Sequence, residues 1–87
     1  MNPARTKALR RTILEQLKHA QGYALPDDAL RPMVDSLMRP PVSDEEWKLS
    51  MDWLETNTMT VRVASELDAD LIQHSITERG RVALQTL

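Results

Sequence analysis

The sequence predicts a mainly α-helical fold with a small antiparallel β-hairpin, within one domain that spans residues 1–87. Apolar residues recur at helical spacing in three successive segments of the first two thirds of the chain. Two short stretches that follow alternate with the strand period of two, and a polar turn separates them. No repeat, low-complexity segment or linker interrupts these patterns, so we expect all of the elements to share one hydrophobic core.

The first helix is predicted over about residues 4–20. Its apolar stripe is formed by residues at i, i+4, i+8 and i+11, which are Leu9, Ile13, Leu17 and Ala20. Pro3 suits the first helical position, and Gly22 is typical of a residue that follows a helix end. This segment is therefore expected to be an amphipathic helix that buries one face.

The second helix is expected to begin near residues 30–31, after a tight turn at residues 26–28. This start follows from Pro32, because a proline is tolerated only in the first turn of a helix. The helix is expected to end before Pro40, since a residue that precedes proline avoids the helical conformation. Between the first two helices, residues 24–25 could form a very short strand.

The third helix has a specific start signal. Ser43 and Glu46 form an S-x-x-E capping box, in which each side chain accepts a hydrogen bond from the backbone N–H of the other residue. From there the helix is expected to run to about Thr56. Asn57 suits the left-handed conformation that often follows a helix C-terminus.

A β-hairpin is predicted after the third helix. In TMTVRVAS, Met59, Val61 and Val63 alternate with Thr60 and Arg62, which is the strand period of two, and Val61 and Val63 are expected in the core. ELDAD is interpreted as the polar turn, and LIQHSI as the second strand. Thr77 can then cap a short final helix. The inward residues of that helix are expected to be Ala83, Leu84 and Leu87.

Together, the patterns predict a core to which every helix and the hairpin contribute. Its expected members are Leu9, Ile13, Leu17, Leu30, Val34, Leu37, Trp47, Met51, Leu54, Val61, Val63, Ile76 and Leu84. The chain has no Phe, one Tyr and two Trp, so aliphatic residues and five Met have to fill most of this core. A domain of this size buries only about 60–65% of its unfolded surface, so its expected stability is modest and a dimer would help it.

The predicted order of elements is helix, short strand, helix, helix, hairpin and helix, which is the order of a winged helix-turn-helix with the hairpin as the wing. Five stretches carry a further likeness: RRTILEQL, GYALPDDAL, VSDEEW, MDWLETN and ITERGRVAL. In them the chain resembles the winged-helix superfamily of small prokaryotic regulators and, more narrowly, short winged-helix proteins encoded in Mu-like prophages. The resemblance implies a three-helix core, a wing and a short C-terminal helix, in a non-enzymatic protein that binds DNA and regulates transcription.

The charges are unevenly distributed, although the net charge is only −2. Residues 1–18 hold five basic residues against one acidic residue, whereas residues 44–57 hold five acidic residues against one lysine. Because DNA affinity comes largely from Lys and Arg at the phosphates, the first helix and the wing would lead any contact to duplex DNA. The candidate residues are Arg5, Lys7, Arg10, Arg11, Lys18, Lys48 and Arg62. The alternatives for the basic helix are a solvated face, or pairing with the acidic half of a second copy.

The acidic third helix is poorly suited to a phosphate backbone, and such regulators often carry basic or neutral polar residues there. Its core face is assigned to Trp47, Met51 and Leu54. The opposite face is a candidate protein interface, with the residues Glu45, Leu49, Asp52 and Thr56, and Trp53 at its flank. An outward Leu49–Trp53 pair would suit a homodimer or another protein, because Trp is a frequent interface anchor. Alternatively, Trp53 packs back against the wing or the second helix, and Leu49 is an isolated surface residue.

Nothing in the sequence indicates an enzyme. The absence of cysteine excludes disulfides, thiolate metal sites and Cys nucleophiles. His19 and His74 lack the spacing of metal ligands, and we expect His74 to be a partly buried hairpin residue. Two glycines cannot form a phosphate-cradling loop. We therefore expect no catalytic residue, metal, cofactor or small-molecule substrate.

The sequence favours a cytoplasmic protein that does not bind membranes. No apolar run approaches the roughly 20 residues that cross a bilayer. The basic N-terminal segment lacks the long apolar stretch and small-residue cleavage site of a signal peptide. The absence of cysteine is in keeping with the cytosol.

Overall fold

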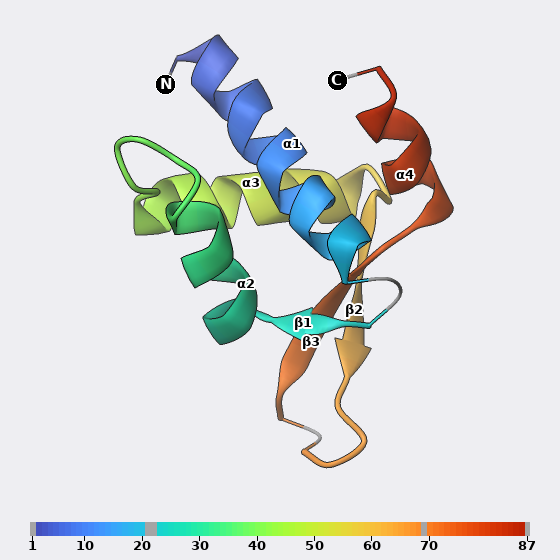
Figure 1. Cartoon of the computed structure of the whole chain (residues 1–87). Coiled ribbons are helices and arrows are strands. Elements are labelled where there is room, and N and C mark those ends of the chain that lie inside the picture. Colours follow the sequence, from blue (N-terminus) through green and yellow to red (C-terminus); the bar gives the residue numbers. More distant parts are fainter. Residues whose placement is uncertain (1, 21–22, 69, 87) are drawn as a thin grey trace.

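The computed structural model describes residues 2–20, 23–68 and 70–86, which form a small α+β fold of four helices and a three-stranded antiparallel sheet. The elements in chain order are α1 (Pro3–His19), β1 (Leu25–Pro26), α2 (Asp27–Asp35), α3 (Asp44–Thr56), β2 (Thr60–Ala64), β3 (Ile72–Ile76) and α4 (Glu78–Leu84). Figure 1 shows the β2–β3 hairpin projecting away from α1, α3 and α4. Gly22 and Leu87, to which the sequence assigned roles, lie outside the described residues. Within these ranges, no helix combines the length and apolarity needed to cross a membrane.

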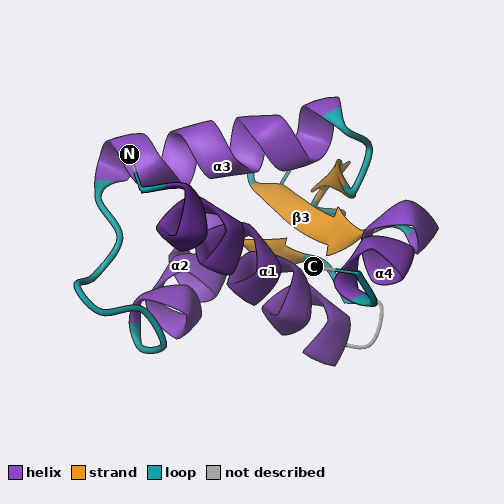
Figure 2. Ribbon diagram, turned by 90° about the horizontal axis from the view of Figure 1, so that it is seen from above, coloured by secondary structure: helices purple, strands orange, loops and turns teal. Residues whose placement is uncertain are grey.

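The sheet has the strand order β1-β3-β2. Strands β2 and β3 run antiparallel, with Thr60 opposite Ile76 and Ala64 opposite Ile72. The two-residue strand β1 joins the other edge of β3. Figures 1 and 2 both place α4 on the opposite side of the fold from α2. The predicted hairpin is confirmed, and the short first strand lies at residues 25–26 instead of 24–25.

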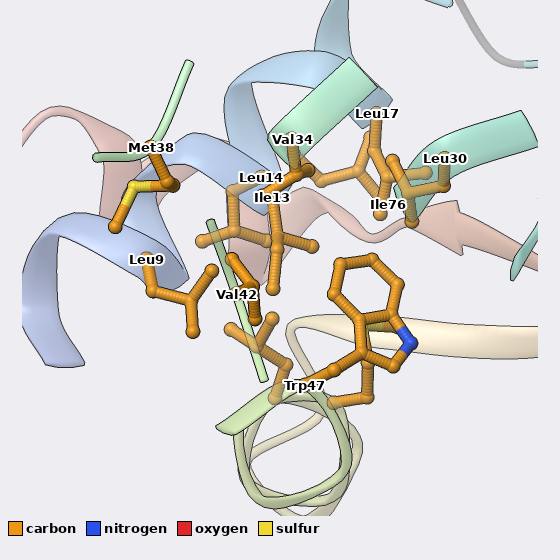
Figure 3. Close-up of a cluster of buried hydrophobic side chains, with 12 residues drawn as sticks. Leu9, Ile13, Leu14, Leu17, Leu30, Val34, Met38, Val42, Trp47 and Ile76 are labelled. Atoms are coloured by element: carbon orange, nitrogen blue, oxygen red, sulfur yellow. The ribbon is translucent and has the colours of Figure 1, made fainter. Parts of the chain in front are cut away.

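The core lies where α1, α2 and α3 meet the sheet (Figure 3). Its buried apolar members are Leu9, Ile13, Leu14, Leu17, Leu30, Val34, Met38, Val42, Trp47, Met51, Leu54 and Ile76. Helices α1, α2 and α3 each contribute one face to this cluster, and for α1 and α3 the apolar spacing predicted which face is buried. Leu84 of α4, also predicted to be inward, packs against the cluster while partly buried.

Helices α1, α3 and α4 begin where the side chains of capping residues accept hydrogen bonds from free backbone N–H groups. The Asn2 side chain accepts a hydrogen bond from the Ala4 N–H at 2.9 Å at the start of α1. Both hydrogen bonds of the predicted capping box of Ser43 and Glu46 are present at the start of α3. Thr77 opens α4 as predicted, and its hydroxyl accepts from the N–H of the third helical residue. The first and third helices therefore have the extent that the sequence predicts.

The prediction for the second helix was wrong at its start, while the predicted end before Pro40 is confirmed. Helix α2 begins at Asp27, directly after Pro26, so Pro32 falls at its sixth position. A proline there removes one backbone hydrogen bond, and the helix tolerates this loss because it is anchored in the core. The helix ends at Asp35, so helical spacing does not extend to Leu37. Leu37 is 59% exposed, in contrast to its predicted place in the core.

The predicted face of the first hairpin strand was also wrong. Val61 and Val63 are 45% and 39% exposed, and Thr60 is buried in their place. The pairing of Thr60 with Ile76 places Thr60 on the face that the core covers, whereas Arg62 and Ala64, on the same face but farther along the hairpin, are exposed. The two valines therefore lie on the outer face of the sheet.

The turn between α3 and β2 is tight. Thr58, and not Asn57, takes the left-handed conformation, with a φ of 56°. Gly80 packs against this turn, because a Cβ atom there would meet the Met59 carbonyl and lie 2.8 Å from Ile76 Cγ1. The absence of a side chain at Gly80 lets α4 approach the sheet closely.

Candidate interaction surfaces

The outer face of α3 is exposed along the whole helix. It consists of Glu45, Lys48, Leu49, Asp52 and Thr56. The helix turns this face to solvent because its opposite side, with Trp47, Met51 and Leu54, is buried in the core. Leu49 remains 49% exposed within this polar surface. The structure therefore brings together the predicted interface residues, with the exception of Trp53.

Trp53 does not point outward beside Leu49, in contrast to the first interpretation of the sequence. Its side chain is partly buried and packs against the core. The guanidinium carbon of Arg10 lies 3.8 Å from the centroid of the Trp53 ring, which is cation–π geometry. This contact ties α1 to α3 and shields the indole from solvent. Leu49 is therefore the exposed apolar side chain of the outer face.

Three of the acidic residues of α3 are bound to arginines from other elements. These ion pairs are Asp44 with Arg31, Glu46 with Arg5 and Glu55 with Arg62, at N–O distances of 2.6, 2.6 and 2.9 Å. Glu45 and Asp52 form no ion pair with any described residue. The free negative charge of α3 is thus concentrated on its outer face, on either side of Leu49.

The pair of Arg5 and Glu46 joins the start of α1 to the start of α3. Arg5 also donates a hydrogen bond to the Pro40 carbonyl oxygen at 2.8 Å. The Arg5 hydrogen bond and the Ser43 backbone N–H lower the pKa of Glu46 from 4.5 to about 2. The same pairing raises the pKa of the Arg5 guanidinium. Arg5 is therefore a structural residue at this corner, and its charge is already neutralised.

The basic candidates do not form one continuous cationic surface. Arg5, Arg10, Arg11 and Arg62 are engaged with Glu46, Trp53, Glu15 and Glu55 respectively. Lys7, Lys18 and Lys48 are exposed and have no ion pair with a described residue. Lys7 and Arg11 line a shallow hollow of about 370 Å³ on α1. Lys48 and Arg62 instead line a second hollow, between α3 and the sheet.

The second hollow has a volume of about 220 Å³ and mixed charge. His74 is buried at its base, and His74 Nε2 lies 2.6 Å from Asp27 Oδ1 at the start of α2. His74 Nδ1 lies 3.7 Å from a Glu55 carboxylate oxygen and has no hydrogen-bond partner among the described residues. The contact of His74 Nε2 with Asp27 explains why a histidine can be buried in β3. This pairing could not be predicted from the sequence, because Asp27 and His74 are 47 positions apart.

The hairpin carries a further set of exposed apolar side chains. We call Val61, Val63, Leu67 and Leu71 the hairpin patch; Ile72 is also exposed, but it pairs with Ala64 and lies on the other face of the sheet. Sequence reasoning missed this patch because it assigned the two valines to the core. The described residues contain no group of three or more His, Asp or Glu side chains placed to hold a metal ion.

Comparison of the chain with protein-family models, with curated proteins and with solved structures finds no match.

Proposed function

We propose that this chain is a small, non-enzymatic winged-helix protein that docks a partner protein through the outer face of α3. The order of elements and the strand order β1-β3-β2 support a winged helix in which the hairpin is the wing. The resemblance to short winged-helix proteins of Mu-like prophages points to the same kind of small regulator. The distribution of charge is then the basis for choosing between a protein and DNA as the partner.

One observation carries the proposal. Leu49 is half exposed on the outer face of α3, between the carboxylates of Glu45 and Asp52, which have no ion pair within the described residues. An apolar side chain with an acidic surround fits a partner that offers an apolar pocket with basic residues at its rim. With Glu45, Lys48 and Asp52, the same face carries a net charge of −1, so it offers no attraction to the phosphates of DNA, which bind Lys and Arg.

Site-specific crosslinking tests the proposal. A photoreactive residue at position 49 should crosslink the partner in cells, and the purified partner is then titrated with the variants. Leu49→Asp should weaken its binding roughly 10-fold or more, because a charge would enter the centre of the interface. Leu37→Asp is the matched control, since Leu37 is a leucine outside α3 that is somewhat more exposed than Leu49. A partner that binds Leu49→Asp as tightly as the wild-type protein would refute docking through α3.

DNA binding is the second candidate, and it is favoured by the exposed lysines of α1. Lys7 and Lys18 have no ion pair with a described residue, so they are available to phosphates. The decisive measurement is a titration of the protein into labelled duplex DNA at low and at physiological salt. No binding even at low salt would refute this function. Binding that Lys7→Glu plus Lys18→Glu abolishes, and that Leu49→Asp leaves unchanged, would instead favour it over docking through α3.

A further inference from the structure

The two edges of the sheet differ in how they are protected. The β1 edge is two residues long and contains Pro26, which lacks a backbone N–H and discourages strand pairing. The β2 edge is five residues long, with the sequence TVRVA, and contains neither proline nor lysine. Natural proteins normally blunt an edge of this kind with such residues. The β2 edge is therefore open to another strand.

The hydrogen bonds at the ends of the β2–β3 ladder show which backbone groups face outward. The Thr77 N–H donates to the Met59 carbonyl at 3.0 Å, and the Ser65 N–H donates to the Leu71 carbonyl at 3.2 Å. Because such bonds alternate along an antiparallel pair, the odd-numbered residues of β2 bond to β3. The even-numbered residues turn their N–H and C=O groups to the free edge. Of these, Arg62 and Ala64 are exposed.

The side chains along this edge also lack a repelling charge. Arg62 Nε lies 2.9 and 3.0 Å from the two carboxylate oxygens of Glu55, so the one charged residue of β2 is neutralised within its own chain. This pairing raises the pKa of the Arg62 guanidinium, with the Glu55 hydrogen bond as the main cause. On the other face, Val61 and Val63 are exposed. An approaching strand therefore meets free backbone groups, two valines and no net charge.

We propose that a second copy of this chain pairs with β2 in antiparallel register, with Val63 at the two-fold axis. In this register Arg62 of each chain lies opposite Ala64 of the other, and their outward N–H and C=O groups form a hydrogen-bonded pair on each side of the axis. The two Val63 side chains meet directly across the axis on the outer face. The result is a continuous six-stranded sheet across the dimer.

The β2 edge is complementary to itself, and this favours a second copy of the chain as the strand that pairs with it. The small Ala64 leaves room for the bulky Arg62 and Glu55 pair of the opposite chain. Because of the two-fold symmetry, the same fit occurs on both sides of the axis. Because the Arg62 charge is already neutralised, two identical edges meet without repulsion. An isologous contact also closes after two chains, which prevents further growth. This dimer uses the hairpin and is independent of the docking proposed for α3.

The oligomeric state in solution tests the proposal. Sedimentation equilibrium from micromolar to millimolar protein should give a mass that approaches twice the 9.9 kDa of one chain. Val63→Lys and Ala64→Pro should each give the mass of a single chain, since they add a charge at the axis or remove an outward N–H. Val82→Lys is the matched control, because Val82 is an exposed valine on α4, and it should remain dimeric.

The register has its own test, because the chain contains no natural cysteine. Val63→Cys should form an intermolecular disulfide on mild oxidation, since directly opposed residues of a non-hydrogen-bonded pair have Cα atoms about 4.5 Å apart. Val61→Cys should not, because the two copies of Val61 lie on opposite sides of the axis. Crosslinking of Val61→Cys but not of Val63→Cys would overturn the register.

Two further results would overturn the dimer itself. One is a wild-type mass of a single chain even at millimolar protein. The other is a dimer that persists in Val63→Lys and dissociates in Leu49→Asp, which would assign self-association to α3. Loss of partner docking in Leu49→Asp with an unchanged dimer mass leaves both proposals standing, so each can fail without the other.

Discussion

The helical body and the hairpin of this molecule are stabilised in different ways. Helices α1, α2 and α3 provide nine of the twelve buried core residues, and the segment between α2 and α3 adds Met38 and Val42. Ion pairs join α1 and α2 to α3. The β2–β3 hairpin contributes buried side chains only at the end next to the body, which are Thr60, His74 and Ile76. Its remaining length carries the hairpin patch. The body therefore determines whether the chain folds, and the hairpin beyond its base is free to serve the self-association that we propose.

This division has a physical basis in the size of the chain. A domain this small has little apolar surface to bury, so stability must come from one concentrated core. Apolar residues that stay outside that core contribute almost nothing to folding. Five exposed aliphatic residues on one hairpin are thus better explained by contact with another chain. Variants in the two regions should separate stability from association.

The largest effect is expected in the body. Leu54 of α3 is fully buried in the core. Leu54→Ala should lower the free energy of unfolding by about 2–5 kcal/mol, because it removes buried methyl groups and leaves a cavity. Urea denaturation followed by circular dichroism measures this change. A loss below about 1 kcal/mol would show that the core relaxes around the cavity, and would weaken the contrast with the hairpin.

A smaller effect is expected at the corner where α1 meets α3, and it depends on pH. The folded pKa of Glu46 is about 2 and lies below its usual value of 4.5, so the ionised carboxylate stabilises the fold above pH 4.5. This stabilisation is lost as the pH falls from 4.5 toward 2. Glu46→Gln keeps the capping box but removes the charge, so its melting temperature should fall below the wild-type value above pH 4.5 and approach it near pH 2.

The neighbouring acid provides the control for this pH effect. Glu45→Gln changes the same charge in the same helical turn, but Glu45 has no ion pair within the described residues. Its melting temperature should follow the wild-type value through the same pH range. If the two variants show the same pH-dependent change in melting temperature, the negative charge of the first helical turn causes it, and the ion pair with Arg5 does not.

The smallest effect on stability is expected in the hairpin. Val63→Thr should change the free energy of unfolding by no more than about 0.5 kcal/mol, because the side chain is exposed and threonine keeps its β-branched shape. The measurement is the same urea denaturation, at micromolar protein. A loss comparable to that of Leu54→Ala would contradict the assignment of Val63 to the surface.

The sequence predicted the helices better than the strands. Leu9, Ile13 and Leu17 recur over several turns, so their spacing specifies both the helix and its buried face. The capping box at Ser43 and Glu46 located the start of α3 because its two hydrogen bonds are local. Local signals of this kind can be recognised without knowledge of the rest of the fold.

The failures share a dependence on distant residues. Alternation shows that Val61 and Val63 share a face, but the pairing of Thr60 with Ile76 decides which face is buried. Likewise, Pro32 lies well inside α2 because packing in the core outweighs its helix-breaking tendency. Neither the strand pairing of Thr60 nor the core packing of α2 could be identified from the spacing of nearby residues.

The same limit applied to the candidate surfaces. The exposed residues of α3, such as Leu49, could be predicted from helical periodicity. The neutralisation of Arg5 by Glu46 could not, since these residues are 41 positions apart. Without those pairings, the basic residues of α1 looked more available to DNA than the structure makes them.

The contact between Arg10 and Trp53 has an optical consequence. The chain contains two tryptophans, of which Trp47 is buried in the core and Trp53 lies one helical turn from Leu49, beneath a guanidinium group. The intrinsic fluorescence therefore combines one emitter in the interior with another at the border of the outer face of α3. A partner that covers Leu49 would alter the emission of the second and leave the first unchanged, whereas unfolding would shift both to longer wavelength. The unlabelled protein thus carries its own spectroscopic reporter of docking.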